Sequence, residues 1–213
     1  RNIIPVPKTL SMEEWASIPL VFLTAWHILV TRAQLKKKES ILIHAAGSGV
    51  GSAAIQIAKL LGAHVITTVG SDEKMKRARE LGPNNLIHYK NKDFVSEVMR
   101  LTRGEGVDVV LDHIGGETFS KSLLCLKKKG RLITCGATSG RSVTFDLRHL
   151  FSRQISIMGS YMGSLYELKR VIRRVKKKKL KPVIDKVFPL NQAKLALSRM
   201  LSRENFGKII LKP

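Results

Sequence analysis

Cysteine, acidic side chains and long apolar runs are all scarce in this sequence. The two cysteines, Cys125 and Cys135, lie within or beside apolar segments and match no metal-ligand spacing, so we expect buried free thiols in the reducing cytoplasm. The longest apolar stretch, IPLVFLTAWHILV, has 13 residues and a proline, which is too short to span a membrane. No signal peptide opens the chain, which begins at Arg1 rather than at a methionine.

The shortage of acids gives the chain a strong positive charge. Sixteen Asp and Glu face 38 Lys and Arg, so the formal net charge is +22. Residues 167–182 alone hold nine basic side chains and one acid. Two interpretations stay open: solvated helix faces, as in lysine-rich thermophile proteins, or a surface that binds RNA or a ribonucleoprotein. The candidates for the second are Lys169, Arg170, Arg173, Arg174, Lys176, Lys177, Lys178 and Lys179. No RNA-recognition pattern accompanies them.

Apolar segments and helical patterns alternate along most of the 213 residues. We predict strands at 41–45, 65–69, 86–88, 107–112 and 130–136, with a helical segment between each pair, and a sixth strand at 154–160 after them. Because the strands are almost continuously apolar, they indicate a parallel sheet covered on both faces, hence an α/β, Rossmann-type doubly wound fold.

The flanking regions complete the predicted organisation. One helix should begin near a capping box formed by Ser11 and Glu14 and run to about Leu35. A basic helix over 164–179, a helix from about Asn191 and a final strand at 207–213 follow the sheet. The predicted segments are a linking region at 1–35, a dinucleotide-binding domain at 36–162 and a C-terminal part at 163–213.

A glycine-rich turn follows the first predicted strand, in ILIHAAGSGVGSAAIQIAKLLGAHV. The order of strand, turn, helix and strand places this turn at a helix N-terminus, where free N–H groups favour a pyrophosphate. Read literally, Gly47 and Gly49 begin the G-x-G-x-x-G fingerprint, and its third position falls on Ser52. Shifting the register by one puts Ala46, Ser48 and Gly51 at those positions. We prefer this register because Gly51 then lies where the helix must pack against the strand.

The second predicted strand ends in TTVGSDEK, without an acid at its last position. An acid there favours NAD through the ribose, whereas Gly70 leaves room for a 2′-phosphate, and Ser71 and Lys74 offer it a hydroxyl and a cation. We expect Asp72 to cap the next helix instead of binding the ribose. These residues favour NADPH as the cofactor.

Five stretches in this order resemble one family: IPLVFLTAWHIL, ILIHAAGSGVGSAAIQIAKLLGAHVI, DVVLDHIGGETF, GRLITCGATSG and NFGKIIL. They are similar to the zinc-independent medium-chain dehydrogenase/reductases, above all to NADPH:quinone oxidoreductases and alkenal reductases. The resemblance implies a Rossmann fold, NADPH, a small-molecule electron acceptor and a possible homodimer paired through the strand after the fifth.

The resemblance also implies a set of cofactor-binding positions, which fall on several loops. The phosphate turn is Gly47, Ser48, Gly49, Val50 and Gly51, and the 2′-phosphate pocket is Gly70, Ser71, Lys74 and Tyr89. The nicotinamide side is Thr24, Asp112, Gly136, Ala137, Thr138 and Ser160, with Met162 in the same loop, and the terminal motif is Asn205, Gly207 and Lys208.

The sequence departs from the family pattern in two places. Leu20 stands where the zinc-dependent branch has a cysteine ligand, and His27 and His44 are expected to be satisfied core residues, so no catalytic zinc is expected. The GroES-like substrate domain that precedes this segment in the family is absent, which implies a fragment or a reduced relative. The leading hypothesis is an NADPH-dependent reductase, or its cofactor-binding portion, acting on a quinone or an α,β-unsaturated carbonyl. The alternative is an idle Rossmann module bound to RNA.

Overall fold

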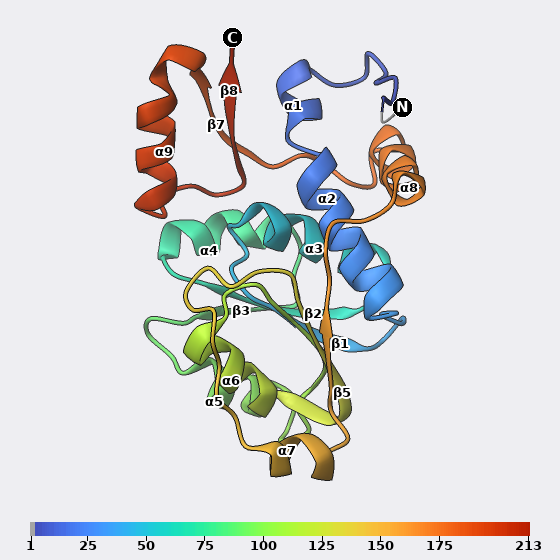
Figure 1. Cartoon of the computed structure of the whole chain (residues 1–213), viewed down its shortest axis with the longest axis vertical. Coiled ribbons are helices and arrows are strands. Elements are labelled where there is room, and N and C mark those ends of the chain that lie inside the picture. The colour runs from blue at the N-terminus through green and yellow to red at the C-terminus, as the bar shows by residue number, and fades with distance from the viewer. Residues whose placement is uncertain (1–2) are drawn as a thin grey trace.

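Six parallel strands form the centre of the computed structural model, which describes residues 3–213 (Figure 1). They are β1 (Ser40–Ile43), β2 (His64–Val69), β3 (Asn85–His88), β4 (Val107–Asp112), β5 (Leu126–Thr134) and β6 (Ser156–Gly159). Their spatial order is β3-β2-β1-β4-β5-β6, so the chain changes direction across the sheet between β1 and β4. This order confirms the doubly wound prediction. Folds of this kind bind ligands where the strand order reverses, so the expected ligand crevice is at the carboxyl ends of β1 and β4.

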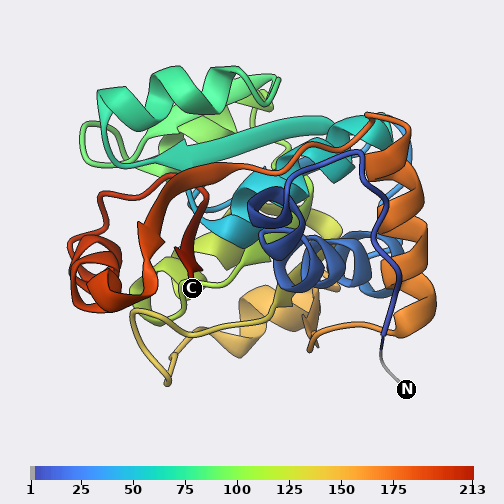
Figure 2. The same ribbon diagram turned by 90° about the horizontal axis from the view of Figure 1, so that it is seen from above.

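Helices cover both faces of this sheet (Figure 1). In chain order they are α1 (Met12–Ala16), α2 (Pro19–Trp26), the π-helix η1 (His27–Arg32), α3 (Gly49–Leu60), α4 (Asp72–Arg79), α5 (Phe94–Leu101), α6 (Gly116–Leu124), α7 (Leu147–Ser152), α8 (Leu165–Lys176), the 3₁₀ turn η2 (Leu190–Gln192) and α9 (Ala193–Leu201). A separate parallel pair, β7 (Ile184–Pro189) and β8 (Lys208–Lys212), lies beside α9 at one end of the molecule (Figures 1 and 2).

Side chains alternate between two hydrophobic clusters because successive residues of a strand point to opposite faces. Ile41 and Ile43 join the cluster shared with α2, α3 and α8, whereas Leu42 joins the cluster shared with α5 and α6. The first cluster draws on all three predicted segments, for example through Trp15, Val171 and Phe206. The boundaries 1–35, 36–162 and 163–213 therefore do not separate independent cores.

The predicted helix from Ser11 to Leu35 is wrong in its continuity. Ser11 and Glu14 do form the expected capping box, but α1 ends at Ala16 and a new helix begins at Pro19. Proline has no N–H to continue the hydrogen bonds of α1, and it is well suited to the first turn of α2. After Trp26 the helix widens into η1, a change that local periodicity does not signal.

Several other boundaries differ from the sequence-based prediction. β1 ends at Ile43 rather than at Ala45, whose φ of 52° lies in the left-handed region, and β5 begins four residues earlier than expected, at Leu126. Strand β7 and helix α7 were not predicted at all. β7 carries the sequence IDKVFP, and it is a strand because β8 lies beside it. Asp72 is not the cap of α4, a role that Ser71 takes.

Other expectations are confirmed. Both cysteines are free, Cys125 buried and Cys135 partly buried. Burial raises the pKa of Cys125 to about 12 and that of Cys135 to about 11, so neither is a reactive thiolate. Within residues 3–213, no helix has the length and apolarity of a membrane span. β6 is an edge strand of the sheet, and pairing through it in a homodimer stays a prediction.

Candidate dinucleotide-binding site

The glycine-rich turn connects β1 to α3 at the crevice. Ser48 is the N-cap of α3, and its hydroxyl oxygen accepts a hydrogen bond from the Gly51 amide at 2.8 Å. A Cβ on Gly51 would collide with the carbonyl oxygen of Ala45, so only glycine permits this close approach of helix and strand. The packing role expected of Gly51 is confirmed. The amides of Gly49 and Val50, the first two residues of α3, point out of the helix end, as anion-binding amides do.

The C-terminal motif lies directly over this turn. The Gly207 amide donates to the carbonyl oxygen of Gly47 at 2.8 Å, and the Asn205 side chain donates to the carbonyl oxygen of Gly207 at 3.2 Å. The aliphatic part of Lys208 passes 3.1 Å from the position of a Cβ on Gly49. Residues about 160 positions apart, as the numbering shows, are thereby brought together, and Lys208 adds a cation beside the turn.

The residues expected to bind a 2′-phosphate come together at the end of β2. The hydroxyl oxygen of Tyr89 lies 2.6 Å from where a Cβ on Gly70 would stand, so glycine is needed for Tyr89 to occupy this position. Ser71 caps α4 by accepting from the Lys74 amide at 3.2 Å. The Lys74 ammonium group donates to the carbonyl oxygen of Arg203 at 2.5 Å, and partial burial lowers its pKa.

Asp72 differs from the expectation that it would cap α4. It is the first residue of the helix, its side chain is 86% exposed, and a carboxylate oxygen lies 3.9 Å from Nε2 of His88. The shorter Ser71 side chain precedes the helix in extended backbone geometry and reaches the amide first. The carboxylate of Asp72 is therefore mostly exposed at the start of α4, with the His88 ring as its neighbour.

Asp112 also differs from its predicted role, because its carboxylate faces inward. It is fully buried, one oxygen accepts from the amides of Ile114 at 2.8 Å and Gly115 at 3.0 Å, and the other accepts from the Ser122 hydroxyl at 2.8 Å. With both oxygens engaged, Asp112 shapes the loop after β4 and offers no group to a cofactor.

The remaining nicotinamide-side candidates lie on neighbouring loops. Gly136, Ala137 and Thr138 are exposed after β5, and the Thr138 hydroxyl donates to the carbonyl oxygen of His113 at 3.3 Å. Ser160 follows β6, and its amide donates to the carbonyl oxygen of Thr134 at 2.8 Å. Thr24 is buried in α2, one turn beyond Val21, whose side chain contacts Gly49.

His113 follows Asp112 in the DHIGG stretch, and the sequence reasoning gave its side chain no role of its own. It is 9% exposed, and burial lowers its pKa, so the ring is neutral near pH 7. Its Nε2 lies 3.1 Å from the Ser48 hydroxyl. Among the described residues nothing pairs with its buried Nδ1 or with the buried hydroxyl of Ser160. A polar residue directly after a buried strand was the available signal.

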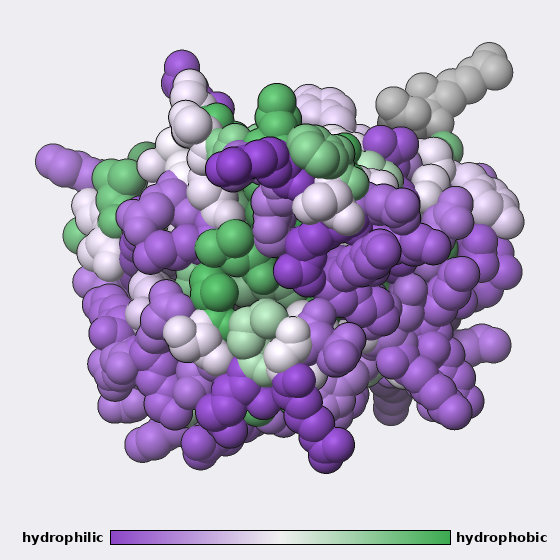
Figure 3. Space-filling model, turned by 90° about the horizontal axis from the view of Figure 1, so that it is seen from below, coloured by the Kyte–Doolittle hydropathy of each residue, from purple (hydrophilic) through white to green (hydrophobic). Residues whose placement is uncertain are grey.

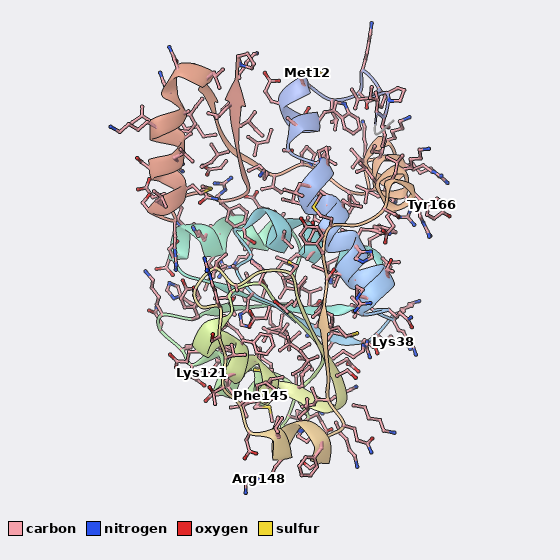
Figure 4. The ribbon with its side chains drawn as sticks, in the orientation of Figure 1. Met12, Lys38, Lys121, Phe145, Arg148 and Tyr166 are labelled. Atoms are coloured by element: carbon pink, nitrogen blue, oxygen red, sulfur yellow. The ribbon has the colours of Figure 1, made fainter. Side chains whose placement is uncertain are left out.

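The basic residues of 169–179 do not form one binding face. Arg170 and Arg174 lie over the Trp26 ring at 5.7 and 4.4 Å, so both guanidinium groups contribute to the packing of α8 on α2. The other six candidates are exposed around the end of the helix, and Tyr166 extends outward beside them (Figure 4). The face in Figure 3 is likewise mostly hydrophilic, with a small hydrophobic group near its centre. The geometry lends no support to the RNA alternative.

The two histidines expected to be core residues both have partners. His27 pairs with Glu167 at 3.0 Å, and His44 lies between Thr68 and Ser122. Over residues 3–213, no three His, Cys, Asp or Glu side chains come together as a metal site.

A family profile described as zinc-binding dehydrogenase matches residues 49–177, more than half of the chain. The 2-haloacrylate reductase of a Burkholderia species is 36% identical over 224 residues, covering 100% of this chain and 67% of the relative. The chain belongs to the medium-chain dehydrogenase/reductase family. The family expected from the sequence motifs is confirmed.

Two solved structures share the fold of this family member. The crystal structure of an NAD-dependent alcohol dehydrogenase has a TM-score of 0.94 and 44% identity, with 99% of this chain and 61% of that chain covered. A mycobacterial structure complexed with NADPH has a TM-score of 0.89 and 29% identity, with 98% and 68% covered. This chain therefore spans 61% to 68% of the length of these three proteins.

Proposed function

We propose that this chain binds NADPH and serves as the cofactor-binding portion of a reductase that delivers hydride to a quinone or an α,β-unsaturated carbonyl compound. The observation that carries the proposal is the cradle of the phosphate turn, Lys208 and the pocket of Gly70, Lys74 and Tyr89, all at the carboxyl edge of one sheet. A nicotinamide cofactor supplies the hydride when it is bound, so the task of the chain is to hold and orient it.

The phosphate turn suits a pyrophosphate by its donors and its charge. The amides of Gly49 and Val50 and the N-terminal end of the α3 dipole favour an anion. Lys208 brings a flexible ammonium group past Gly49.

The end of β2 suits a 2′-phosphate. The aliphatic part of Lys74 lies 3.5 Å from where a Cβ on Gly47 would stand. Its ammonium group is held by a single carbonyl oxygen, which a phosphate can replace as partner. The Tyr89 hydroxyl lies over Gly70, where an acidic side chain would stand in a typical NAD site. Both features favour NADPH over NADH.

NADH is the second candidate, and Asp72 is the observation that favours it. Its exposed carboxylate begins α4 two residues after Gly70 and is free to accept hydrogen bonds from ribose hydroxyls. The same charge would repel a 2′-phosphate. The choice of cofactor therefore depends on the balance between Lys74 and Asp72.

Calorimetric titration with NADPH and NADH tests the choice. We expect NADPH to bind roughly ten- to a hundredfold more tightly, because a charge-assisted hydrogen bond contributes about 1.5–3 kcal/mol. Lys74→Ala should remove most of that preference, whereas Lys76→Ala, on the exposed side of the same helix, should leave it unchanged. Tighter binding of NADH, reversed by Asp72→Asn, would establish the second candidate instead.

The acceptor class needs a separate experiment. Quinones follow from the resemblance of the sequence motifs, and 2-haloacrylate, named for the Burkholderia relative, is an α,β-unsaturated acid. Steady-state oxidation of the preferred cofactor by the natural protein should be measured with both classes. Reduction of neither class, at cofactor concentrations that saturate the site, would contradict the acceptor part of the proposal.

A further inference from the structure

A continuous chain of buried hydrogen bonds joins the phosphate turn to the loop after β4. The Ala45 amide donates to the Thr68 hydroxyl oxygen at 3.0 Å, and that oxygen lies 3.2 Å from Nδ1 of His44. Nε2 of His44 lies 2.9 Å from the Ser122 hydroxyl, which donates to Asp112 at 2.8 Å. Asp112 in turn accepts from the amides of Ile114 and Gly115. Every side chain in this chain of bonds is buried.

The direction of each bond follows from the carboxylate end. The Asp112 carboxylate accepts, so the Ser122 hydroxyl proton points toward it and the Ser122 oxygen must accept from His44. His44 therefore carries its proton on Nε2. Burial disfavours a second proton on the ring, so Nδ1 is an acceptor and takes the Thr68 hydroxyl proton. The Thr68 oxygen is left to accept from the Ala45 amide.

The two ends of this chain hold backbone that lines the crevice. Ala45 has a φ of 52°, a left-handed conformation that is strained for a residue with a side chain, and the bond from its amide to Thr68 holds that conformation in place. At the other end, Asp112 fixes the amides of Ile114 and Gly115, next to His113.

We propose that Thr68, His44, Ser122 and Asp112 are positioning residues that fix the phosphate turn and the loop after β4 relative to one another, so that both halves of one dinucleotide fit. This inference rests on the proposed function for the identity of the ligand. The arrangement of protons along the four side chains does not depend on the ligand. On the proposed function, the adenosine end is held by Gly70, Ser71 and Lys74. The side-chain hydrogen bonds of Ser71 and Lys74 join these two residues and Arg203, and none of them reaches His44, Ser122 or Asp112. Loss of these hydrogen bonds should therefore weaken binding of the whole dinucleotide but not binding of its adenosine end alone.

Nitrogen NMR of the His44 ring tests the arrangement directly. We expect a protonated, pyrrole-like Nε2 and an unprotonated, pyridine-like Nδ1 at pH 7, whether or not a cofactor is present. A proton found on Nδ1 would overturn the proposal, because the Thr68 hydroxyl then has no acceptor on His44 and the chain of bonds is broken.

Cofactor affinity tests the positioning role. Thr68→Val and Ser122→Ala should each weaken NADPH binding roughly three- to tenfold, the range for one lost hydrogen bond. Both variants should bind adenosine 2′,5′-bisphosphate as the wild type does. Thr68→Ser keeps the hydroxyl and should restore NADPH affinity.

Thr67→Val is the matched control. Thr67 is the neighbouring residue of β2, is fully buried and donates a 2.7 Å hydrogen bond to the carbonyl oxygen of Ile43, on the opposite face of the sheet from His44. It should lose similar stability without losing NADPH affinity. Equal losses of affinity in Thr67→Val and Thr68→Val would overturn the positioning role. Failure of the wild-type chain to bind NADPH would contradict the proposed function, and the His44 ring would still report on the hydrogen-bonded chain.

Discussion

Nε2 of His113 lies 3.1 Å from the hydroxyl oxygen of Ser48, and this contact joins the loop after β4 to the start of α3. The two residues lie in the connections that follow β1 and β4, neighbouring strands between which the order of the sheet reverses. The same Ser48 oxygen caps α3 by accepting from the Gly51 amide. One hydroxyl group therefore supports both the helix and the crevice wall.

Removing this hydroxyl should cost more stability than removal of an ordinary cap. We expect Ser48→Ala to lower the free energy of unfolding by about 2 kcal/mol, because it removes a cap and leaves a buried imidazole nitrogen without a partner. Ser71→Ala, which removes the cap of α4 without affecting a histidine, should lower it by about 1 kcal/mol. Urea unfolding measures both, and equal losses would show that His113 gains nothing from Ser48.

Gly51 should tolerate no side chain. A Cβ there meets the backbone oxygen of Ala45 and lies 2.8 Å from the Ser48 hydroxyl, so Gly51→Ala should destabilise the fold by roughly 1–3 kcal/mol through overpacking. Gly159→Ala is the control, because nothing lies within 4 Å of its added Cβ. Thermal unfolding should show a lower Tm for the first variant alone. A fully stable Gly51→Ala protein would contradict the close packing of α3 on β1.

Acidification should destabilise the protein through His44. Burial lowers its pKa from 6.5 to about 4, with Asp112 and His113 as the charged or titratable neighbours. The unfolded chain takes up this proton below pH 6.5 and the folded chain does not, so stability is complete above that pH and falls as the pH approaches 4. The full loss is about 3 kcal/mol.

His44→Gln removes this titration while keeping an amide that donates and accepts. Its free energy of unfolding should fall less steeply than that of the wild type between pH 7 and pH 4.5. Some slope should remain from His113, whose pKa burial also lowers. Parallel pH profiles for the two proteins would contradict the prediction, because they would show that His44 takes up its proton at the same pH in the folded and the unfolded chain.

The buried carboxylate of Glu167 should contribute to the stability of the fold. It accepts from the Ser164 amide at 2.7 Å and from the Thr31 hydroxyl at 2.5 Å, and these bonds help to hold its pKa at about 2 against the effect of burial. Glu167→Gln should lower the free energy of unfolding by roughly 1.5–3 kcal/mol. Glu14→Gln, in the more exposed capping box of α1, should cost less in the same denaturation experiment. The reverse order would contradict the assignment of Glu167 as a link between η1 and α8.

The sequence by itself determined the features that depend on near neighbours in the chain. The apolar strands, the glycine-rich turn at the start of α3, and the capping box of Ser11 and Glu14 were all predictable, because propensity and spacing act over a few residues. The close approach required at Gly51 followed from the same turn.

Only the tertiary structure decided which polar groups meet. His44 bonds Thr68 and Ser122, which are 24 and 78 positions away. β1 pairs with β2, which carries Thr68, and with β4, which leads into the helix α6 that carries Ser122. The inward turn of Asp112 and the strand character of β7 likewise depend on partners distant in sequence. Periodicity shows which face of an element is buried, whereas the partner of a buried hydrogen-bonding group is fixed by how the strands and helices pack.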